Sequence, residues 1–405
     1  MQPSNPLRFR ASTATYVSAT VLLSALLAAC GGDVHDTSAP VPQLFAQTND
    51  TTNELLHFMR NADGTLTAKA TVPTGGKGTN GVNYFMGNAV APDALTSNNS
   101  VIVSPDGARL FVANAGDNTV SVLSIDKASG NPTLLAVSPT GGTRPTSLAF
   151  HNGVLYVTHQ QGATELGAYR VGDDGKLTQI GQYAVVQQDA LPTQVAVSPD
   201  GKFVVVNGFL RTLTPVQPAN TLLAFPINAD GTLGTSVATT SVGTGPFGGR
   251  FGTGAMAATF VVSDAAGVTA SSYSLASSGS FTALSGPLAV TGQAAPCWVS
   301  LTPDNRFAYI GNGSGAVSLF SIDGSGKLAL VNATAASEPA TSTASTSSFA
   351  NDSWISPDGK FLYQDYAGDD KIVVYSIASS GALTKLGEQP ANTQSKISLQ
   401  GLAGI

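Results

Sequence analysis

The most regular carboxylates of this sequence lie in a repeated Ser-Pro-Asp-Gly tetrapeptide, at Ser104–Gly107, Ser198–Gly201 and Ser356–Gly359. An aspartate in such a loop could bind a cation or act as an acid. However, proline suits the second position of a type I turn, aspartate the third, and glycine the left-handed position that completes a hairpin bulge. Because backbone geometry alone demands these residue types, we interpret the aspartates as turn residues.

Histidine and cysteine, the usual bases, nucleophiles and soft metal ligands, are scarce. The four histidines are His35, His57, His151 and His159, and the two cysteines are Cys30 and Cys297. No His, Cys and carboxylate cluster has metal-ligand spacing, and no Gly-rich phosphate loop or Gly-x-Ser-x-Gly elbow occurs. We therefore expect no metal, no cofactor and no disulfide framework, and we interpret Cys297 as a buried small hydrophobic residue.

A second pattern recurs along the chain: an alternating apolar run, a turn ending in Gly, and a Leu or Phe two residues later. Its seven copies are centred on Phe58, Leu123, Tyr169, Phe225, Tyr273, Phe320 and Tyr375. The repeat of about 50 residues has the size of a propeller blade of four antiparallel strands. Each Ser-Pro-Asp-Gly hairpin, with the variant Thr302–Asn305, precedes the second pattern within its unit.

The two ends of the repeat region look like halves of one blade. Residues 42–49 match the strand after a Ser-Pro-Asp-Gly turn, and residues 399–405 match the strand before one. Pairing of these end strands would close a ring and protect its edges. The sequence therefore predicts an all-β fold, a seven-bladed β-propeller of four-stranded antiparallel blades, spanning residues 42–405.

The first 29 residues have the pattern of a secretory signal peptide. Arg8 and Arg10 precede an apolar run at 21–29 that is too short to span a bilayer. The run ends in Leu-Ala-Ala-Cys, which resembles the bacterial lipobox, so we predict lipidation of Cys30 and a flexible tether over 30–41. These features predict a lipid-anchored protein of the bacterial cell envelope, with the membrane as a partner.

Charge argues against nucleic acid as a partner. Removal of Arg8 and Arg10 with the leader leaves 17 of the 19 Lys and Arg residues against 25 Asp and Glu, a net charge of −8. The basic residues are also unclustered, whereas nucleic-acid binding needs a basic patch.

The combination of the Ser-Pro-Asp-Gly turn, strands such as Leu-Tyr-Val-Thr-His (155–159) and the second repeat resembles the lactonase family of seven-bladed propellers. That family includes a bacterial 6-phosphogluconolactonase and a fungal carboxymuconate cycloisomerase. The resemblance covers nearly all of residues 42–405 and is more specific for architecture than for activity. It implies a catalytic His at the channel mouth, five residues before the Pro of the turn, supported by Arg and Glu.

None of the corresponding positions of this chain is a histidine. They are Ser100, Ser147, Gln194, Gly248, Trp298 and Asp352. Opening a lactone needs a general base and a donor for the oxyanion. Asp352, with a pKa raised by burial, and Arg144 and Arg250 as donors form the candidate catalytic set that remains.

Other residues at these positions could bind a ligand without catalysis. Gln194 and Ser147 offer neutral hydrogen-bonding groups, and Trp298 could stack on a sugar ring at the mouth or pack between blades. Trp354 is expected two positions further along its strand. Two insertions, 75–99 and 333–353, should overhang the same face, where binding tends to occur on a rigid scaffold.

Three functions remain open at this point. The first is a divergent propeller that binds a small molecule, sugar or partner at the channel mouth. The second is a sugar-lactone hydrolase that uses Arg and Asp in place of His. The third is a structural envelope protein that only makes protein contacts. A pocket shared by Arg144, Arg250 and a carboxylate would favour the enzyme, and an open mouth lined by Trp298 and polar residues would favour the binding protein. A structural protein needs neither feature and could have a plugged channel.

Overall fold

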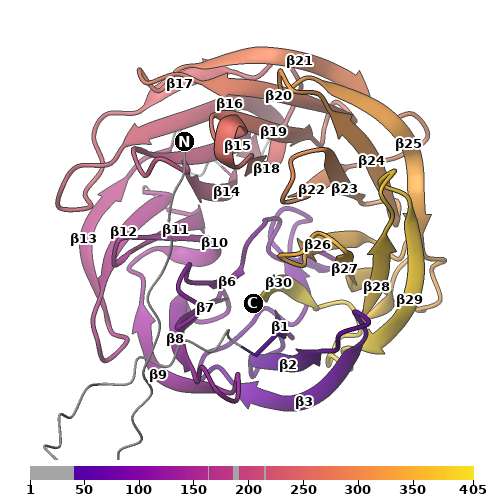
Figure 1. Cartoon of the computed structure of the whole chain (residues 1–405). Helices are drawn as coiled ribbons and strands as arrows, with labels where there is room; N and C mark the ends of the chain where they lie inside the picture. The colour runs from indigo at the N-terminus through magenta and orange to yellow at the C-terminus, as the bar shows by residue number, and fades with distance from the viewer. Residues whose placement is uncertain (1–40, 163, 186–190, 214–215) are drawn as a thin grey trace, which may run out of the picture. The chain divides into compact units, whose positions relative to one another are not determined.

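Seven antiparallel sheets of four strands form a ring in the described part of the chain (Figure 1). The computed structural model describes residues 41–162, 164–185, 191–213 and 216–405, all within the compact unit Ala39–Ile405. The predicted signal peptide, Cys30 and all of the tether except residue 41 lie outside the described residues. Within those described ranges, no helix has the length and apolar character needed to cross a membrane.

The blades follow one another along the chain. Blade one contains β1 (Gln43–Gln47), β2 (Glu54–Arg60), β3 (Leu66–Pro73) and β30 (Gln400–Gly404). Blade two contains β6 (Val101–Val103), β7 (Arg109–Asn114), β8 (Thr119–Ile125) and β9 (Pro132–Pro139). Blade three contains β10 (Thr143–His151), β11 (Val154–Gln161), β12 (Leu166–Val171) and β13 (Leu177–Tyr183). Blade four contains β14 (Leu191–Val197), β15 (Phe203–Leu213), β16 (Val216–Pro226) and β17 (Val237–Thr240).

The remaining blades repeat this order. Blade five contains β18 (Pro246–Phe251), β19 (Thr259–Asp264), β20 (Thr269–Leu275) and β21 (Phe281–Ala289). Blade six contains β22 (Pro296–Leu301), β23 (Phe307–Asn312), β24 (Ala316–Ile322) and β25 (Leu328–Ser337). Blade seven contains β26 (Ala350–Ile355), β27 (Phe361–Tyr366), β28 (Lys371–Ile377) and β29 (Leu383–Pro390). Short elements between them are β4 (Val82–Asn83), β5 (Ala89–Val90) and the 3-10 turns η1 (Gly254–Met256) and η2 (Ala367–Asp369).

Closure of the ring occurs within blade one. β30 pairs antiparallel with β1, with Leu44 opposite Gly404, and Gln43 and Ile405 exchange two backbone hydrogen bonds of 3.1 Å. The innermost strand of this blade therefore comes from the C-terminal end of the chain, and its other three strands from the N-terminal end. The predicted seven-bladed propeller closed by strands from both ends is confirmed.

The Ser-Pro-Asp-Gly segments are hairpin turns, as their residue types predict. In the first, Asp106 Oδ1 accepts hydrogen bonds from the Ser104 hydroxyl (2.5 Å) and the Ala108 N–H (3.1 Å), and Gly107 has φ 70°. The Ser104 hydroxyl and backbone amides hold the pKa of the Asp106 carboxyl below its usual range. These bonds occupy the carboxylate in the turn itself.

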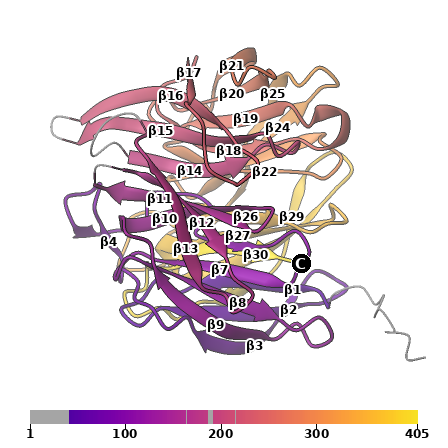
Figure 2. The ribbon, with the colours of Figure 1, turned by 90° about the vertical axis from the view of Figure 1, so that its left-hand side faces the viewer.

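Apolar side chains pack between neighbouring blades. The cluster between blades one and two contains Phe45, Leu55, Val101, Leu110, Val112 and Leu123, all buried. Each pair of facing sheets thus buries one face of each blade, which makes the scaffold rigid. Two faces of the ring remain: one carries the starts of the inner strands, and the other, named here the turn face, carries the Ser-Pro-Asp-Gly hairpins. Figure 2 shows β4 on one face and the C-terminus on the opposite face.

Candidate functional site

We name the residues that lie five positions before each turn proline the ring positions. They connect neighbouring blades through hydrogen bonds. The Ser147 hydroxyl accepts a hydrogen bond from Val195 N–H (3.0 Å) in the next blade. The Gln194 amide both donates to Gly249 O and accepts from Gly249 N–H, each at 2.5 Å. Their polar atoms are therefore already engaged in the scaffold.

Asp352 occupies the same position in blade seven and joins it to the closing strand. Its Oδ2 accepts the Gly401 N–H (2.9 Å), and its Oδ1 accepts the Asn99 N–H (3.3 Å). Burial raises the pKa of the Asp352 carboxyl to about 6, although these bonds, the Gln400 amide and the charge of Arg250 favour its ionised form. A carboxyl with this pKa is half-ionised near the pH at which general bases work.

Residues 93–98, which we name the cap segment, close the face where the inner strands begin. All six residues are buried. Asn98 N–H donates to Thr193 O in blade four (3.0 Å), and the Ser97 hydroxyl donates to Thr146 O in blade three (3.0 Å). Asp93 accepts from the Gln400 amide of the closing strand (3.0 Å). The cap segment therefore spans the mouth that the family resemblance marks as the site of chemistry.

Trp298 lies beneath this cap segment. Its indole N–H donates to Ser97 O (3.0 Å), only 1% of the residue is exposed, and its ring packs edge-on against Phe247 and Phe349. The expectation that Trp298 faces an open mouth therefore differs from the structure, in which the side chain packs within the protein and anchors the 75–99 insertion.

Arg144 also contacts that insertion. Its guanidinium donates to Val82 O (2.8 Å) and lies 5.8 Å from the centroid of the Tyr84 ring. Arg144 has φ 57°, and its backbone N–H donates to the Asn118 side chain (2.8 Å). This residue therefore fastens the β4–β5 hairpin to blade three.

A cavity of about 490 Å³ runs along the axis of the ring, and we name it the axial cavity. It is lined from Asn99 and Gln194 at the starts of inner strands to Pro105 and Pro199 in the turns. Inner strands of six blades contribute to its wall, which places it on the axis. Its volume lies within the range of small-molecule sites, about 300–1,000 Å³.

Arg250 lines the axial cavity. The guanidinium forms no hydrogen bond or salt bridge with any residue that the structure describes, and the residue is partly buried. Burial lowers the pKa of Arg250, and the charge of Asp352 opposes that shift. The structure thus places Arg250 and Asp352 within electrostatic reach of each other, whereas Arg144 lines a separate pocket beside the insertion.

Trp354 is an aromatic residue of the axial cavity that the predicted site did not include. It lines the cavity wall, with the Arg60 guanidinium 4.9 Å from its ring centroid and Tyr363 packed beside it. The available signal was its place two residues after Asp352 in the same inner strand.

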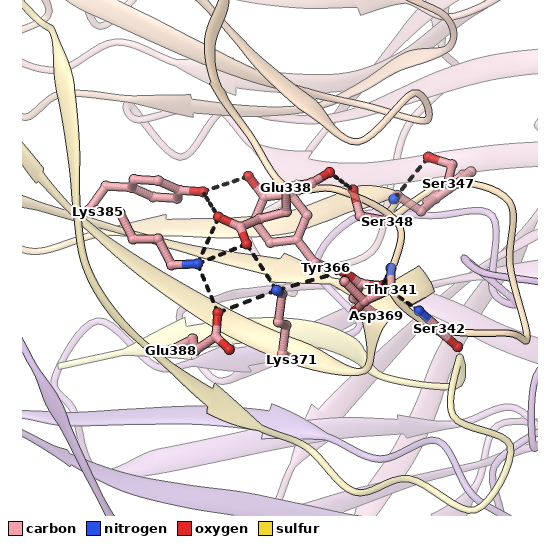
Figure 3. Close-up of polar contacts among 12 residues, drawn as sticks. Glu338, Thr341, Ser342, Ser347, Ser348, Tyr366, Asp369, Lys371, Lys385 and Glu388 are labelled. Carbon is pink, nitrogen blue, oxygen red and sulfur yellow. Dashed lines mark hydrogen bonds and ion pairs between the residues drawn. The ribbon is translucent and has the colours of Figure 1, made fainter.

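Besides the packing of Phe349 on Trp298, ion pairs and hydrogen bonds hold the second insertion (Figure 3). Glu338 accepts from Lys371 Nζ (2.9 Å), Lys385 Nζ (2.8 Å) and the Tyr375 hydroxyl (3.3 Å). Asp369 Oδ1 accepts the Thr341 N–H (2.7 Å) and the Ser342 N–H (3.0 Å). The 333–353 insertion is thereby attached to blade seven.

The two buried histidines, His57 and His159, are weaker bases than a free imidazole. Burial lowers the pKa of His159 to about 4, and burial with the nearby Lys69 charge lowers that of His57 to about 4. His57 also bonds to Gln43 (2.5 Å) and stacks on Phe45. Burial raises the pKa of the Cys297 thiol well above its usual range. Among the described residues, no group of three or more His, Cys, Asp and Glu could hold a metal ion.

Comparison with known proteins relates this chain to one family. The family described as lactonase, 7-bladed beta-propeller, matches residues 47–189, 144–250 and 256–396. No curated protein matches the chain.

Solved structures show a likeness of fold. A putative 6-phosphogluconolactonase from Bacteroides uniformis has 17% identity, covers 91% of this chain and 100% of its own, and gives a TM-score of 0.68. The periplasmic gluconolactonase of Pseudomonas aeruginosa has 18% identity, covers 90% of this chain and 99% of its own, and gives a TM-score of 0.66.

Proposed function

Because the chain belongs to the lactonase family of seven-bladed β-propellers, we propose that it is an exported, lipid-anchored member that binds a small molecule in its axial cavity. One observation carries the proposal. A guanidinium without a hydrogen-bond partner among the described residues, Arg250, borders a cavity of small-molecule size. Convergent polar groups in an apolar pocket are the usual mark of a ligand site.

Binding is favoured over catalysis because the channel mouth where the inner strands begin, at which the family resemblance expects the catalytic residues, is covered. The cap segment covers it, and the side chains of Ser147, Gln194 and Asp352 bond to neighbouring strands. A hydrolase would need a base and an oxyanion donor to reach one bound carbonyl. Arg144, the second predicted donor, lines a different pocket from Arg250.

The lipid anchor rests on the sequence, through the signal peptide at 1–29 and Cys30. A similar propeller from Pseudomonas aeruginosa is described as periplasmic, which agrees with export. Mass spectrometry of the N-terminal peptide should find acyl chains on Cys30 as the first residue. An unmodified N-terminus, identical in the Cys30→Ser variant, would reject the anchor.

Ligand binding can be measured through Trp354, since its ring lines the cavity whereas Trp298 is buried elsewhere. A small-molecule collection should contain compounds that change the Trp354 fluorescence and raise the melting temperature. Ala196 lines the cavity, so Ala196→Phe should abolish these effects. The same substitution at exposed Ala382 is the control. Ligands that bind equally to both variants would reject the axial cavity as the site.

A lactone hydrolase is the second candidate, favoured by the raised pKa of Asp352 beside the charge of Arg250. Hydrolysis of gluconolactone and 6-phosphogluconolactone by the purified protein tests it. Turnover that Asp352→Asn abolishes would support the hydrolase. Absent turnover, or turnover unchanged by Asp352→Asn and Arg144→Ala, would reject it.

A further inference from the structure

The lining of the axial cavity combines an extended apolar wall with a single charged side chain. The apolar part includes Val103, Phe150, Val197, Phe251, Trp354 and Leu402. Among the described residues that line the cavity, Arg250 is the one with a charge. A ligand that fits this wall must bury apolar surface, which contributes about 25 cal/mol per Å².

The polar side chains of the lining differ in whether they are available. Gln194 is bonded to Gly249, and Thr253 to Asn305. The side-chain amide of Asn99, like the guanidinium of Arg250, has no hydrogen bond to any described residue. The amide of Asn99 and the guanidinium of Arg250 are therefore donor groups of the cavity without a hydrogen-bond partner among the described residues.

An arginine in this position needs an anion. The guanidinium stays charged in proteins and presents paired N–H donors that match a carboxylate. Asp352 acts on this charge without a hydrogen bond to it. A carboxylate that enters the cavity therefore supplies hydrogen bonds that the described residues do not give to the guanidinium. Apolar surface and a single cation select against inorganic anions and against neutral sugars alike.

We infer that the axial cavity, entered from the turn face, takes an organic monoanion: a carboxylate carried on an apolar or aromatic body, with the carboxylate on Arg250 and the body against Trp354. This inference rests on the proposed binding function and names the class of its ligand. Asn99 supplies a further N–H donor at the inner end of the cavity.

A matched pair of probes tests the charge requirement. Calorimetric titration with 4-butylbenzoate and 4-butylbenzamide compares two molecules of nearly the same shape, of which only the first is an anion. We expect the benzoate to bind about tenfold or more tightly than the amide. Inorganic phosphate, which has no apolar body, should not bind measurably.

Variants of Arg250 and Ala196 test which residues produce the preference for the benzoate. Arg250→Gln should reduce benzoate affinity by about ten- to hundredfold and leave amide affinity unchanged, while Arg250→Lys should retain part of the preference. Ala196→Phe, which fills the cavity, should abolish binding of both probes. Thermal unfolding of each variant verifies that it folds. If Arg250→Gln does not fold, Arg250→Lys provides a second variant of this residue.

Two failures are distinguishable. Equal affinity for both probes, or no effect of Arg250→Gln on the benzoate, would overturn the anionic ligand class but leave binding in the cavity intact. Tight binding of phosphate would also overturn it. If neither organic probe binds and no compound of the fluorescence screen does, the proposed function fails together with this inference.

Discussion

Asp352 Oδ2 lies 2.9 Å from the backbone nitrogen of Gly401 and accepts its hydrogen bond across the junction between blade seven and the closing strand. The residue that the sequence offers as a catalytic base is therefore also a connection that helps to hold the ring closed. Removing the acceptor would leave a buried N–H unsatisfied, at a cost of about 1–3 kcal/mol. Asparagine keeps an acceptor oxygen for Gly401 but has no charge, which makes Asp352→Asn the informative substitution.

The buried histidine of blade three, His159, should make stability depend on pH. Burial lowers the pKa of His159 from 6.5 to about 4, so the folded protein keeps it neutral while the unfolded chain binds a proton below pH 6.5. Unfolding then takes up a proton, and stability falls as the pH drops from about 6.5 toward about 4.

The variant His159→Asn removes this titration and places in blade three the residue that blade six has at the same register, Asn312. Urea unfolding at pH 7.5 and 5.5 should show that the variant loses about 1 kcal/mol less than the original chain on acidification. The comparison of slopes isolates His159 from His57 and Asp264, which titrate in both proteins. Equal slopes would contradict the prediction.

Arg144 should act as an anchor of the 75–99 insertion. Arg144→Ala removes the bond to Val82 O and the contact with Tyr84. Hydrogen exchange of residues 82–90 should become about tenfold faster, because a hydrogen bond from a charged donor contributes about 1.5–3 kcal/mol.

The control is Arg109→Ala, which removes a similar bond from an exposed guanidinium to Asp173 O. It should leave exchange of residues 82–90 unchanged. If Arg144→Ala had no effect on this exchange but abolished a lactone-hydrolysing activity, the residue would be catalytic instead.

The strand pattern of the propeller could be predicted from sequence because its determinants are local. Turn residues such as Pro105, Asp106 and Gly107 encode the hairpin within four positions, and the repeat multiplies that signal along the chain. Closure followed from two incomplete repeats at the ends. None of these inferences needs contacts between distant residues.

The site could not be predicted in the same way, since it depends on distant contacts and on irregular strands. Ser97 and Trp298 are 201 residues apart in the chain, yet their hydrogen bond decides that the tryptophan is covered. The inner strands also shift register just before the ring positions, for example between Pro296 and Trp298. Such bulges redirect side chains, so alternation alone does not tell which residue faces the axis.

The ionic network of Figure 3 should determine the stability of the second insertion. Glu338 is the hub: its side chain is 6% exposed and pairs with both Lys371 and Lys385. These lysines hold the pKa of the Glu338 carboxyl below its usual range, although burial opposes them. Glu338→Gln should destabilise the protein by about 3 kcal/mol, since it leaves a nearly buried lysine with fewer partners.

Glu388→Gln is the matched control, because the Glu388 side chain is 47% exposed and contacts the same two lysines. A solvent-exposed pair contributes about 0–1 kcal/mol. Urea unfolding measures both variants, and limited proteolysis should cleave residues 339–347 faster in Glu338→Gln alone. Equal destabilisation by the two variants would show that Glu338 is not the hub.

Ligand affinity in the axial cavity should increase as the pH falls through about 6. Above that pH the ionised Asp352 competes with a bound carboxylate for the positive charge of Arg250, and protonation removes the competition. Asp93 and Asp365 also act on this region, and burial raises the pKa of both well above the usual range.

Calorimetry with 4-butylbenzoate at pH 7.5 and 5.5 measures this dependence. The original chain should bind several-fold more tightly at pH 5.5, whereas Asp352→Asn should bind tightly at both values, about tenfold above the original chain at pH 7.5. Asp365→Asn serves as the comparison, because Asp365 interacts with Asp352 but is not among the charges that act on Arg250. If Asp352→Asn retained the full pH dependence, Asp352 would not be the group that competes for Arg250, and a titration of Asp93 or Asp365 would have to account for it.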